Sequence, residues 1–437
     1  MGIDKPTSCS GSSKRDKKIV RYYLSPPPIR LVLESQLFNW LKYQNEAGLP
    51  SNCYVICYHG NPVKFSKEKR EKLEQDIGGK IRYAYFYNKT LLIILQTILL
   101  GCQLWWKEHR RADKIIFQSR IPQVAFGFLL ISFLPKVRVI YDARAAFPEA
   151  KRAKPPKGLL KRVNNSIRLG LQAYSEIMLF RKAHAVFAVS HRIKEFFAKE
   201  FKDCDRDRVY VIPGVADSKQ FNYQPESGTD SRRKHGLENR IVITYAGGLR
   251  ERWQIPEKNF QLFKTLYSLD DSYFFQVLSR DVELAEKMAQ KFGLPDNSYD
   301  IRSVPHDEVN AYLNQADIAL LLRDDDPTNH QASPTKFAEY ALTGLPTIIT
   351  KWIFDYAEIT RKLDLGYVLD NLDFSDDNTI VIHKWILSCV KEPETRRATK
   401  ERINKLAMKY LNKELFVELM RDVIISDEPV QTLTSWF

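Results

Sequence analysis

The segment over residues 333–349, SPTKFAEYALTGLPTII, is the part of the sequence that says most about the fold of this chain. Ser333 suits a helix N-cap, Pro334 the first helical position, and Gly344 the left-handed residue that ends a helix. The sequence therefore predicts a short helix over about residues 334–343, with a buried strand directly after it.

Residues 309–322 predict a short helix that leads into a fully buried strand. With the segment above they make a βαβ unit, whose second helix begins at the carboxyl edge of a parallel sheet. The free N–H groups of such a helix attract an anion, and Lys336 adds a full charge. Glu339 lies about 6 Å further along the axis than Thr335, which suits the hydroxyls of a ribose beside a bound diphosphate. The alternative is an ordinary capped helix with Glu339 on a solvated face.

Apolar strands alternate with helices through both halves of the chain, which at 437 residues exceeds one hydrophobic core. We expect strands at residues 19–24, 54–58, 81–86, 114–118, 137–141, 185–190, 209–212, 241–245, 273–278, 299–303, 318–322 and 347–350. The predicted fold class is α/β, with two Rossmann-like domains facing across a cleft. We place a disordered basic leader at 1–18, an N-terminal domain at 19–221, a polar linker at 222–240, and a C-terminal domain at 241–411.

Charge is distributed unevenly along the chain. Residues 1–215 carry 39 Lys and Arg against 18 Asp and Glu, a net charge of +21, whereas residues 216–437 carry 28 against 35, a net charge of −7. No zinc-finger spacing, aromatic RNA-binding signature or recognition helix supports a nucleic acid as the partner of the basic half. An anionic membrane surface or a phosphate-linked acceptor explains the charge with fewer assumptions.

Two segments of the basic half suggest contact with a membrane. The apolar run at 91–106 is too short to span a bilayer, which needs ~20 apolar residues, but it could lie in the membrane interface. The alternative is a helix that is buried against the sheet and does not contact a membrane. The second segment has a cluster of basic side chains that suits a lipid or phosphate surface, with a solvated charged face as the alternative: Lys151, Arg152, Lys154 and Lys157.

The start of the chain is polar and has no apolar signal segment, and the six cysteines show neither metal spacing nor a dense disulfide framework. Both observations favour a reducing, cytoplasmic location.

Three runs in the second half carry a resemblance to a known family: ADIALLLR at 316–323, SPTKFAEY at 333–340 and GLP at 344–346, with Asn329 between the first two. In order and spacing they resemble the donor-binding signature of the retaining GT-B glycosyltransferases of family four. Further runs extend the resemblance over most of the chain: RKAHAVFAVS at 181–190, VIPGV at 211–215 with Asp217 and Phe221, and YAGGL at 245–249.

The resemblance implies a nucleotide-diphosphate sugar as donor substrate and no cofactor. It also implies that a last helix, at 412–437 here, crosses back onto the first domain. The donor-binding residues that it implies, together with the basic residues beside them, are Gly247, Gly248, Arg250, Arg252, Arg323, Gln331, Ser333, Thr335, Lys336 and Glu339.

The sequence departs from the family pattern at three positions. Gly248 and Trp253 stand where many relatives have an Arg and a Lys, so Arg250, Arg252 and Lys336 would have to neutralise the diphosphate. Gln331 replaces the first of two glutamates that are normally eight residues apart. An amide can hydrogen-bond a sugar hydroxyl, but it brings no negative charge.

On the acceptor side, Asp142, Arg144 and Glu149 follow an expected buried strand and resemble the polar residues at this place in the family. Asp142 could orient the acceptor hydroxyl, and Arg144 could bind a phosphate or carboxylate. A salt bridge that caps the strand end is the alternative. The run at 324–326, three aspartates, resembles a metal-binding motif of another glycosyltransferase fold, but the order of elements is that of the metal-independent one.

The resemblance therefore implies a retaining glycosyltransferase that acts on a glycan or lipid-linked acceptor in cell-surface polysaccharide synthesis, such as capsule or lipopolysaccharide. It would be cytoplasmic and peripheral at the inner face of the cytoplasmic membrane. The departures keep two rivals open: a non-catalytic sugar-nucleotide-binding or scaffold protein, and a GT-B sugar-nucleotide epimerase that needs no acceptor.

Overall fold

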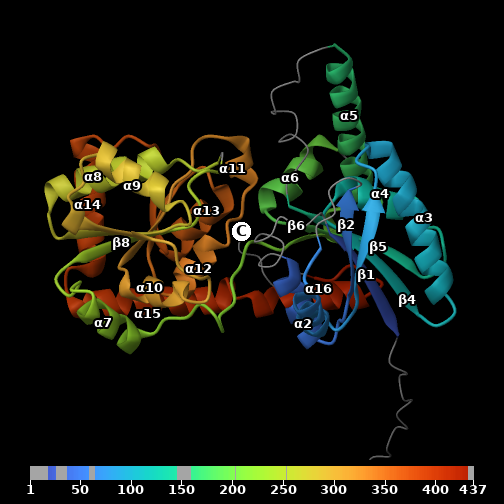
Figure 1. The fold of residues 1–437 in the computed structure, drawn as a ribbon, viewed down its shortest axis with the longest axis horizontal. Helices are drawn as coiled ribbons and strands as arrows, with labels where there is room; N and C mark the ends of the chain where they lie inside the picture. The colour runs from blue at the N-terminus through green and yellow to red at the C-terminus, as the bar shows by residue number, and fades with distance from the viewer. Residues whose placement is uncertain are drawn as a thin grey trace, which may run out of the picture. The chain divides into compact units, whose positions relative to one another are not determined.

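The chain forms two parallel β-sheets with helices beside them, as seen in a computed structural model (Figure 1). The structure describes residues 18–25, 37–58, 64–144, 159–201, 203–251 and 253–431. By compactness the chain divides into two units, Met1–Asn45 with Pro50–Ile140, and Glu46–Leu49 with Tyr141–Phe437.

The first sheet has seven strands in the order β3-β2-β1-β4-β5-β6-β7. Its strands are β1 Ile19–Ser25, β2 Asn52–Tyr58, β3 Ile81–Phe86, β4 Lys114–Ser119, β5 Val137–Ala143, β6 Ala185–Ala188 and β7 Val209–Val211. The register pairs Tyr22 of β1 with Asn52 on one side and with Phe117 on the other. The chain therefore starts in the middle of the sheet and adds strands first to one edge and then to the other.

The second sheet repeats this plan with six strands in the order β10-β9-β8-β11-β12-β13. Its strands are β8 Ile241–Ala246, β9 Tyr273–Leu278, β10 Tyr299–Arg302, β11 Ile318–Leu321, β12 Thr347–Thr350 and β13 Gly366–Leu369. The strand order reverses between β8 and β11, and in open parallel sheets the carboxyl edge at such a switch point is the usual ligand position. The predicted fold class, two Rossmann-like domains of the GT-B type, is confirmed.

Helices connect the strands of both sheets. Those described before β8 are α1 Asn39–Glu46, α2 Lys67–Ile77, α3 Thr90–Glu108, α4 Pro122–Leu129, α5 Leu159–Lys182, α6 His191–Glu200 and α7 Pro225–Lys234. Those after it are α8 Pro256–Leu269, α9 Val282–Lys291, α10 Val309–Gln315, α11 Pro327–Gln331, α12 Lys336–Leu342, α13 Phe354–Leu363, α14 Asp376–Val390, α15 Pro393–Tyr410 and α16 Lys413–Ile425. The segment expected as a linker thus contains α7, while the predicted domain boundaries themselves stay a prediction.

The four inner strands of the second sheet, β9, β8, β11 and β12, are buried on both faces because most of their side chains are apolar. Val242 and Ala246 of β8 face a core formed with α10, α12, α13 and α15, whereas Ile243 and Tyr245 face a core formed with α8, α9 and α14. Figure 1 shows α10 and α15 on one face of this sheet and α8, α9 and α14 on the other. Both faces are therefore occupied by packing, and the edge of the sheet is what remains for a ligand.

A buried charge cluster anchors the amino end of β11. Asp317 is 1% exposed, and its Oδ2 accepts from the Val242 backbone N–H at 2.8 Å and from Arg232 Nη1 at 3.0 Å. Its Oδ1 lies 3.1 Å from Arg396 Nε. Lys400 adds a third cation, and its Nζ donates to the Asn314 carbonyl at 3.0 Å. One carboxylate thus ties α7 and α15 to the second sheet.

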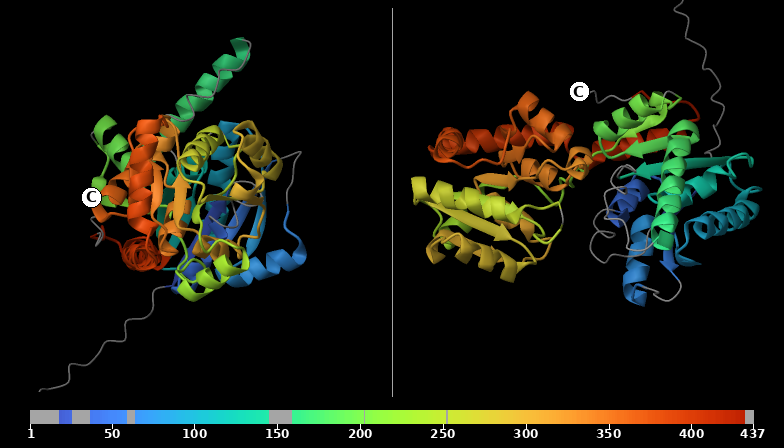
Figure 2. Two further views of the ribbon diagram at one scale, coloured as in Figure 1. Left: turned by 90° about the vertical axis from the view of Figure 1, so that its left-hand side faces the viewer. Right: turned by 90° about the horizontal axis from the view of Figure 1, so that it is seen from above.

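Helices α3 and α5 bury only part of their surface. α3 packs on the first sheet with α4 beside it. The expectation that this segment is too short to span a bilayer is wrong in terms of length, because α3 has 19 residues and is, of the described helices, the one long and apolar enough to cross a membrane by length and composition. Figures 1 and 2 show the amino-terminal part of α5 extending away from α6, which belongs to the same unit. Its Val163, Ile167 and Tyr174 are exposed.

Candidate active site

Helix α12 begins later than the sequence predicts. Its first residue is Lys336, and no side chain caps it. The expected cap, Ser333, uses its Oγ to accept from the Gly214 backbone N–H at 2.8 Å. The N-cap prediction is therefore wrong, because a long-range contact occupies the hydroxyl. The predicted end is confirmed: Gly344 has a φ of +79°, and the Leu345 N–H donates to the Tyr340 carbonyl at 2.9 Å.

Gly247 and Lys336 meet at the carboxyl edge of the second sheet. Gly247 follows β8 directly and has a φ of +138°, a conformation that favours glycine. A Cβ at this position would overlap Nζ of Lys336, the first residue of α12. The positive φ favours glycine at this turn, and the missing side chain leaves the space that the ammonium occupies.

The Lys336 ammonium is held in a partly buried place with few counter-charges. Its Nζ lies 3.5 Å from the Tyr245 hydroxyl and 4.7 Å from the centre of that ring. Burial, and after it the nearby charge of Arg323, lower the pKa of Lys336 to about 7, while Glu339 and Glu251 oppose the shift. A bound anion would favour the charged form of this side chain, which makes the position suitable for a phosphate group.

Arg323 lies behind Tyr245, two residues after β11, and is 3% exposed. Its Nη1 donates to Gln254 Oε1, and its backbone N–H donates to Thr350 Oγ1 at 3.0 Å. The Tyr245 hydroxyl donates to the same Gln254 oxygen at 3.0 Å. The predicted arginine therefore belongs to the wall of the site and adds positive potential from inside the protein. Tyr245 and Gln254 are site residues that the sequence did not predict.

Glu339 lies one helical turn from Thr335, as predicted, and its backbone N–H donates to the Thr335 carbonyl at 3.0 Å. The carboxyl is partly buried. Burial raises its pKa, whereas His306, Lys336 and Lys413 favour the charged form. The carboxylate therefore faces basic side chains from three separate segments, so the alternative of a fully solvated helix face does not hold.

Lys413 is a third residue near the site that the sequence did not predict. It is 5% exposed, begins α16, and donates its backbone N–H to the Ala216 carbonyl at 3.0 Å. Burial lowers the pKa of Lys413 to about 8, while Asp217 and Glu339 oppose the shift. Nothing in the local sequence marks this residue, since its partners come from distant segments.

The charge of Arg250 is already neutralised. Its Nε lies 2.9 Å from Asp281 Oδ1, and its side chain is 64% exposed. Next to it, Glu251 pairs with Arg280 at 2.6 Å, and a Cβ on Gly248 would overlap the Glu251 carboxylate. The connections after β8 and β9 thus each bring an acidic side chain, which leaves Lys336 as the better placed cation. Arg252 lies outside the described residues.

Gln331 is buried at the end of α11. A neutral amide loses less by burial than the glutamate that it replaces.

The aspartates before α11 hydrogen-bond to the helix. Asn329 donates to Asp324 Oδ1 at 2.7 Å, and Asp326 caps the helix by accepting from the Thr328 N–H at 2.8 Å. Among the residues that the structure describes, no group of three or more His, Cys, Asp or Glu could hold a metal ion.

Asp142 and Arg144 form an ion pair at the end of β5. Arg144 Nε lies 2.8 Å from Asp142 Oδ1, and Asp142 is buried. This is the salt bridge that the sequence left open as the alternative, and the role of both residues in acceptor binding stays a prediction. Glu149 and the basic cluster Lys151, Arg152, Lys154 and Lys157 lie outside the described residues.

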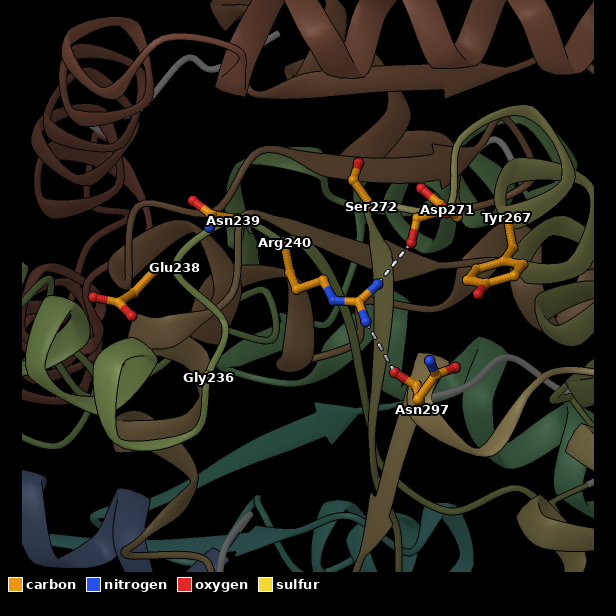
Figure 3. A pocket seen from close by; sticks show the side chains of 8 residues that line it. All are labelled: Gly236, Glu238, Asn239, Arg240, Tyr267, Asp271, Ser272 and Asn297. Carbon is orange, nitrogen blue, oxygen red and sulfur yellow. Dashed lines mark hydrogen bonds between the residues drawn. The ribbon is translucent and has the colours of Figure 1, made fainter.

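A pocket of about 440 Å³ opens at the opposite, amino end of β8 (Figure 3). The Arg240 guanidinium crosses it and donates to the backbone carbonyls of Asp271 at 2.6 Å and Asn297 at 3.4 Å. None of the predicted site residues lines this pocket. It is therefore distinct from the site around Lys336.

Comparison with solved structures shows the fold. A glycosyltransferase from Rickettsia africae is 15% identical, with a TM-score of 0.66 over 94% of this chain and 98% of that one. HepE of Anabaena in complex with UDP is 12% identical, with a TM-score of 0.61 over 92% and 98%. WaaG, a glycosyltransferase involved in lipopolysaccharide biosynthesis, is 17% identical, with a TM-score of 0.61 over 93% and 100%. No family model and no curated sequence matches this chain.

Proposed function

We propose that this chain, which has the GT-B fold, is a retaining glycosyltransferase that uses a nucleotide-diphosphate sugar. The observation that carries the proposal is the Lys336 ammonium, packed on Gly247 at the switch point of the second sheet. Glu339 lies one turn further along α12, where a carboxylate can accept hydrogen bonds from the ribose of a nucleotide whose phosphates lie at Lys336. HepE in complex with UDP-glucose, 13% identical with a TM-score of 0.58, supports this class of donor.

The chemistry requires stabilisation of the leaving group more than covalent help. The bond between the anomeric carbon and the diphosphate oxygen breaks, and the diphosphate departs with the bonding electrons. Lys336 stabilises the charge that develops there, supported by the potential of Arg323. The acceptor hydroxyl attacks from the same face of the sugar, and its proton passes to the departing phosphate oxygen. Retention of configuration follows from this same-face attack.

We further propose a glycan or lipid-linked acceptor in cell-surface polysaccharide synthesis, such as capsule or lipopolysaccharide, and a cytoplasmic location at the inner face of the cytoplasmic membrane. The net charge of +21 on residues 1–215 supports an anionic surface as the partner of this half. The fold of WaaG, with its role in lipopolysaccharide biosynthesis, supports the kind of product. Asp142 and Arg144 are proposed to contact the acceptor.

The test is release of free nucleoside diphosphate from a panel of nucleotide sugars. We expect release to depend on an acceptor extract and to continue in the presence of a chelator, because Lys336 and Arg323 supply the positive charge without a metal. The anomeric configuration of the product is then read by NMR. If a chelator abolished activity and manganese restored it, the metal-independent mechanism would be contradicted. Asp324 and Asp326 would then be candidate metal ligands.

A non-catalytic nucleotide-sugar-binding protein remains the second candidate. It is favoured by Gly248 and Gln331 at positions where relatives have charged residues, and by the pairing of Arg250 with Asp281. Donor binding without release of nucleoside diphosphate, across all acceptor extracts, would favour this function.

Replacing Glu339 with Ala should weaken binding of the nucleoside diphosphate. The variant loses hydrogen bonds from ribose hydroxyls to a charged acceptor, which corresponds to about 1.5–3 kcal/mol. Calorimetric titration measures the change, and Glu358→Ala, an exposed glutamate on α13, is the control that should bind like the wild type. Equal affinities of the two variants would remove Glu339 from the site.

A further inference from the structure

We propose that the exposed face of α3 docks the protein onto an anionic lipid bilayer and lies in its interfacial region. Five side chains define this face, which we call the α3 stripe: Leu91, Leu95, Leu99, Cys102 and Trp106. Leu91, Leu95, Leu99 and Trp106 are 59%, 55%, 65% and 68% exposed, an unusual exposure for four large apolar side chains on one helix. This surface would provide the membrane contact that the proposed function includes. Only the position of a lipid-linked acceptor at that membrane rests on the proposed function.

The α3 stripe is continuous along one side of the helix. At ~100° per residue its five members fall within an arc of about 80°, and they span about 22 Å of the axis. The buried side chains Ile93, Thr97 and Leu104 fall on the opposite side. α3 is therefore divided into one face packed on protein and one apolar face that the described protein leaves uncovered.

The buried face is fixed by close packing against α4 and the loop after it. A Cβ on Gly127 of α4 would lie 3.0 Å from the Ile94 carbonyl oxygen, and a Cβ on Gly101 would overlap Ile131. Trp105 Nε1 also donates to the Pro135 carbonyl at 3.0 Å. Figure 1 shows α3 and α4 side by side. A helix held this firmly along its length is suited to lie on a bilayer and not to cross it.

Charge selects the partner. Exposed cations lie at both ends of the α3 stripe: Lys89 at its start, and Lys107, Arg110 and Arg111 at its end. Glu108, the one acidic residue of α3, accepts from the Tyr22 hydroxyl at 3.0 Å and lies 3.7 Å from Lys107 Nζ, so Lys89, Arg110 and Arg111 are the cations that α3 itself does not neutralise. Cations at the ends of an apolar face, with a tryptophan at the basic end, match an interface of acyl chains below anionic headgroups.

A second copy of this chain fits the α3 stripe less well. It would bring the same cations to the contact, where like charges oppose association. A bilayer that contains anionic lipid presents the opposite charge instead. We therefore commit to the bilayer as the occupant of this face.

The test uses the full chain and vesicles of phosphatidylcholine with or without phosphatidylglycerol. We expect co-sedimentation with the anionic vesicles that weakens as salt is added, together with a blue shift of tryptophan emission. Leu95→Glu combined with Leu99→Glu should lower vesicle affinity by at least about tenfold, since two apolar side chains no longer enter the interface. Arg110→Ser combined with Arg111→Ser should lower it about fivefold or more, and only on anionic vesicles.

Matched controls keep the test specific. Val381→Glu replaces a valine of α14 that is 51% exposed, and Lys391→Ser with Lys405→Ser removes two exposed cations elsewhere. Both controls should bind vesicles like the wild type. All variants should keep their thermal midpoint and their affinity for nucleoside diphosphate, which separates failure of docking from failure of the donor site.

Three results would overturn the proposal. The first is no vesicle binding at low salt, and the second is equal loss in the Val381→Glu control. The third is self-association by light scattering that disappears in the double leucine variant without any vesicle binding, which would assign the α3 stripe to a second copy of the chain.

Discussion

Asp317→Ala should lower the free energy of unfolding by about 3–5 kcal/mol, because it leaves buried cations without their shared carboxylate. In the wild-type chain Asp317 contacts Arg232 at 3.0 Å and Arg396 at 3.1 Å, and it also accepts from the Val242 N–H. Lys400 nearby already has a pKa lowered to about 8 by burial, and Asp317 is the group that opposes this shift. Removing Asp317 therefore disconnects α7 and α15 from the sheet.

Thermal unfolding followed by circular dichroism measures this effect, and we expect a midpoint lower by roughly 10 °C. The control is Asp370→Ala. Asp370 is paired with Arg361, and its side chain is 75% exposed. An exposed pair contributes about 0–1 kcal/mol, so the control should melt close to the wild type. Similar midpoints for the two variants would show that the buried cluster around Asp317 does not stabilise the fold.

Lys336→Met should raise the Kd for a nucleoside diphosphate roughly 10- to 150-fold, the equivalent of about 1.5–3 kcal/mol for a charged hydrogen bond. The wild-type affinity should also depend on pH. Because burial lowers the pKa of Lys336 to about 7, the ammonium that binds the anion is lost from the free protein as pH rises through 7. Affinity should therefore be highest below pH 7 and should fall towards that of the variant above it.

Calorimetry between pH 6 and 9 checks this expectation, with proton uptake on binding as a second readout. The variant should lack the decline that Lys336 causes in the wild type, while Lys384→Met, an exposed lysine of α14, should keep it. A pH profile shared by Lys336→Met and the wild type would assign the titration to another group.

The sequence predicts those parts of the fold that follow local rules. Gly344 ends α12 because only a residue tolerant of a positive φ fits there. The approach of Gly247 to Lys336 follows from the rule that the ends of parallel strands share one edge of a sheet. Strand β13 escaped prediction, since it is short and begins with Gly366.

The parts that could not be predicted depend on distant partners. Ser333 has the residue type of an N-cap, but its hydroxyl is used by Gly214, which lies 119 positions earlier. Arg250 resembles a phosphate ligand until Asp281, from the next connection of the sheet, is seen beside it. The net charge around a site depends on residues that are distant in the sequence, so a local sequence pattern does not predict it.

The position of Lys413 has a practical consequence for anyone who shortens this chain. The last described helix begins with this lysine, whose charge acts on Glu339, and the Asn412 bridge to Ala216 holds it in place. A chain cut before Asn412 would lose an electrostatic partner of the ribose carboxylate along with a helix whose apolar side chains are buried. The carboxyl-terminal segment should therefore be counted as part of the binding site when truncated forms are chosen for crystallisation or screening.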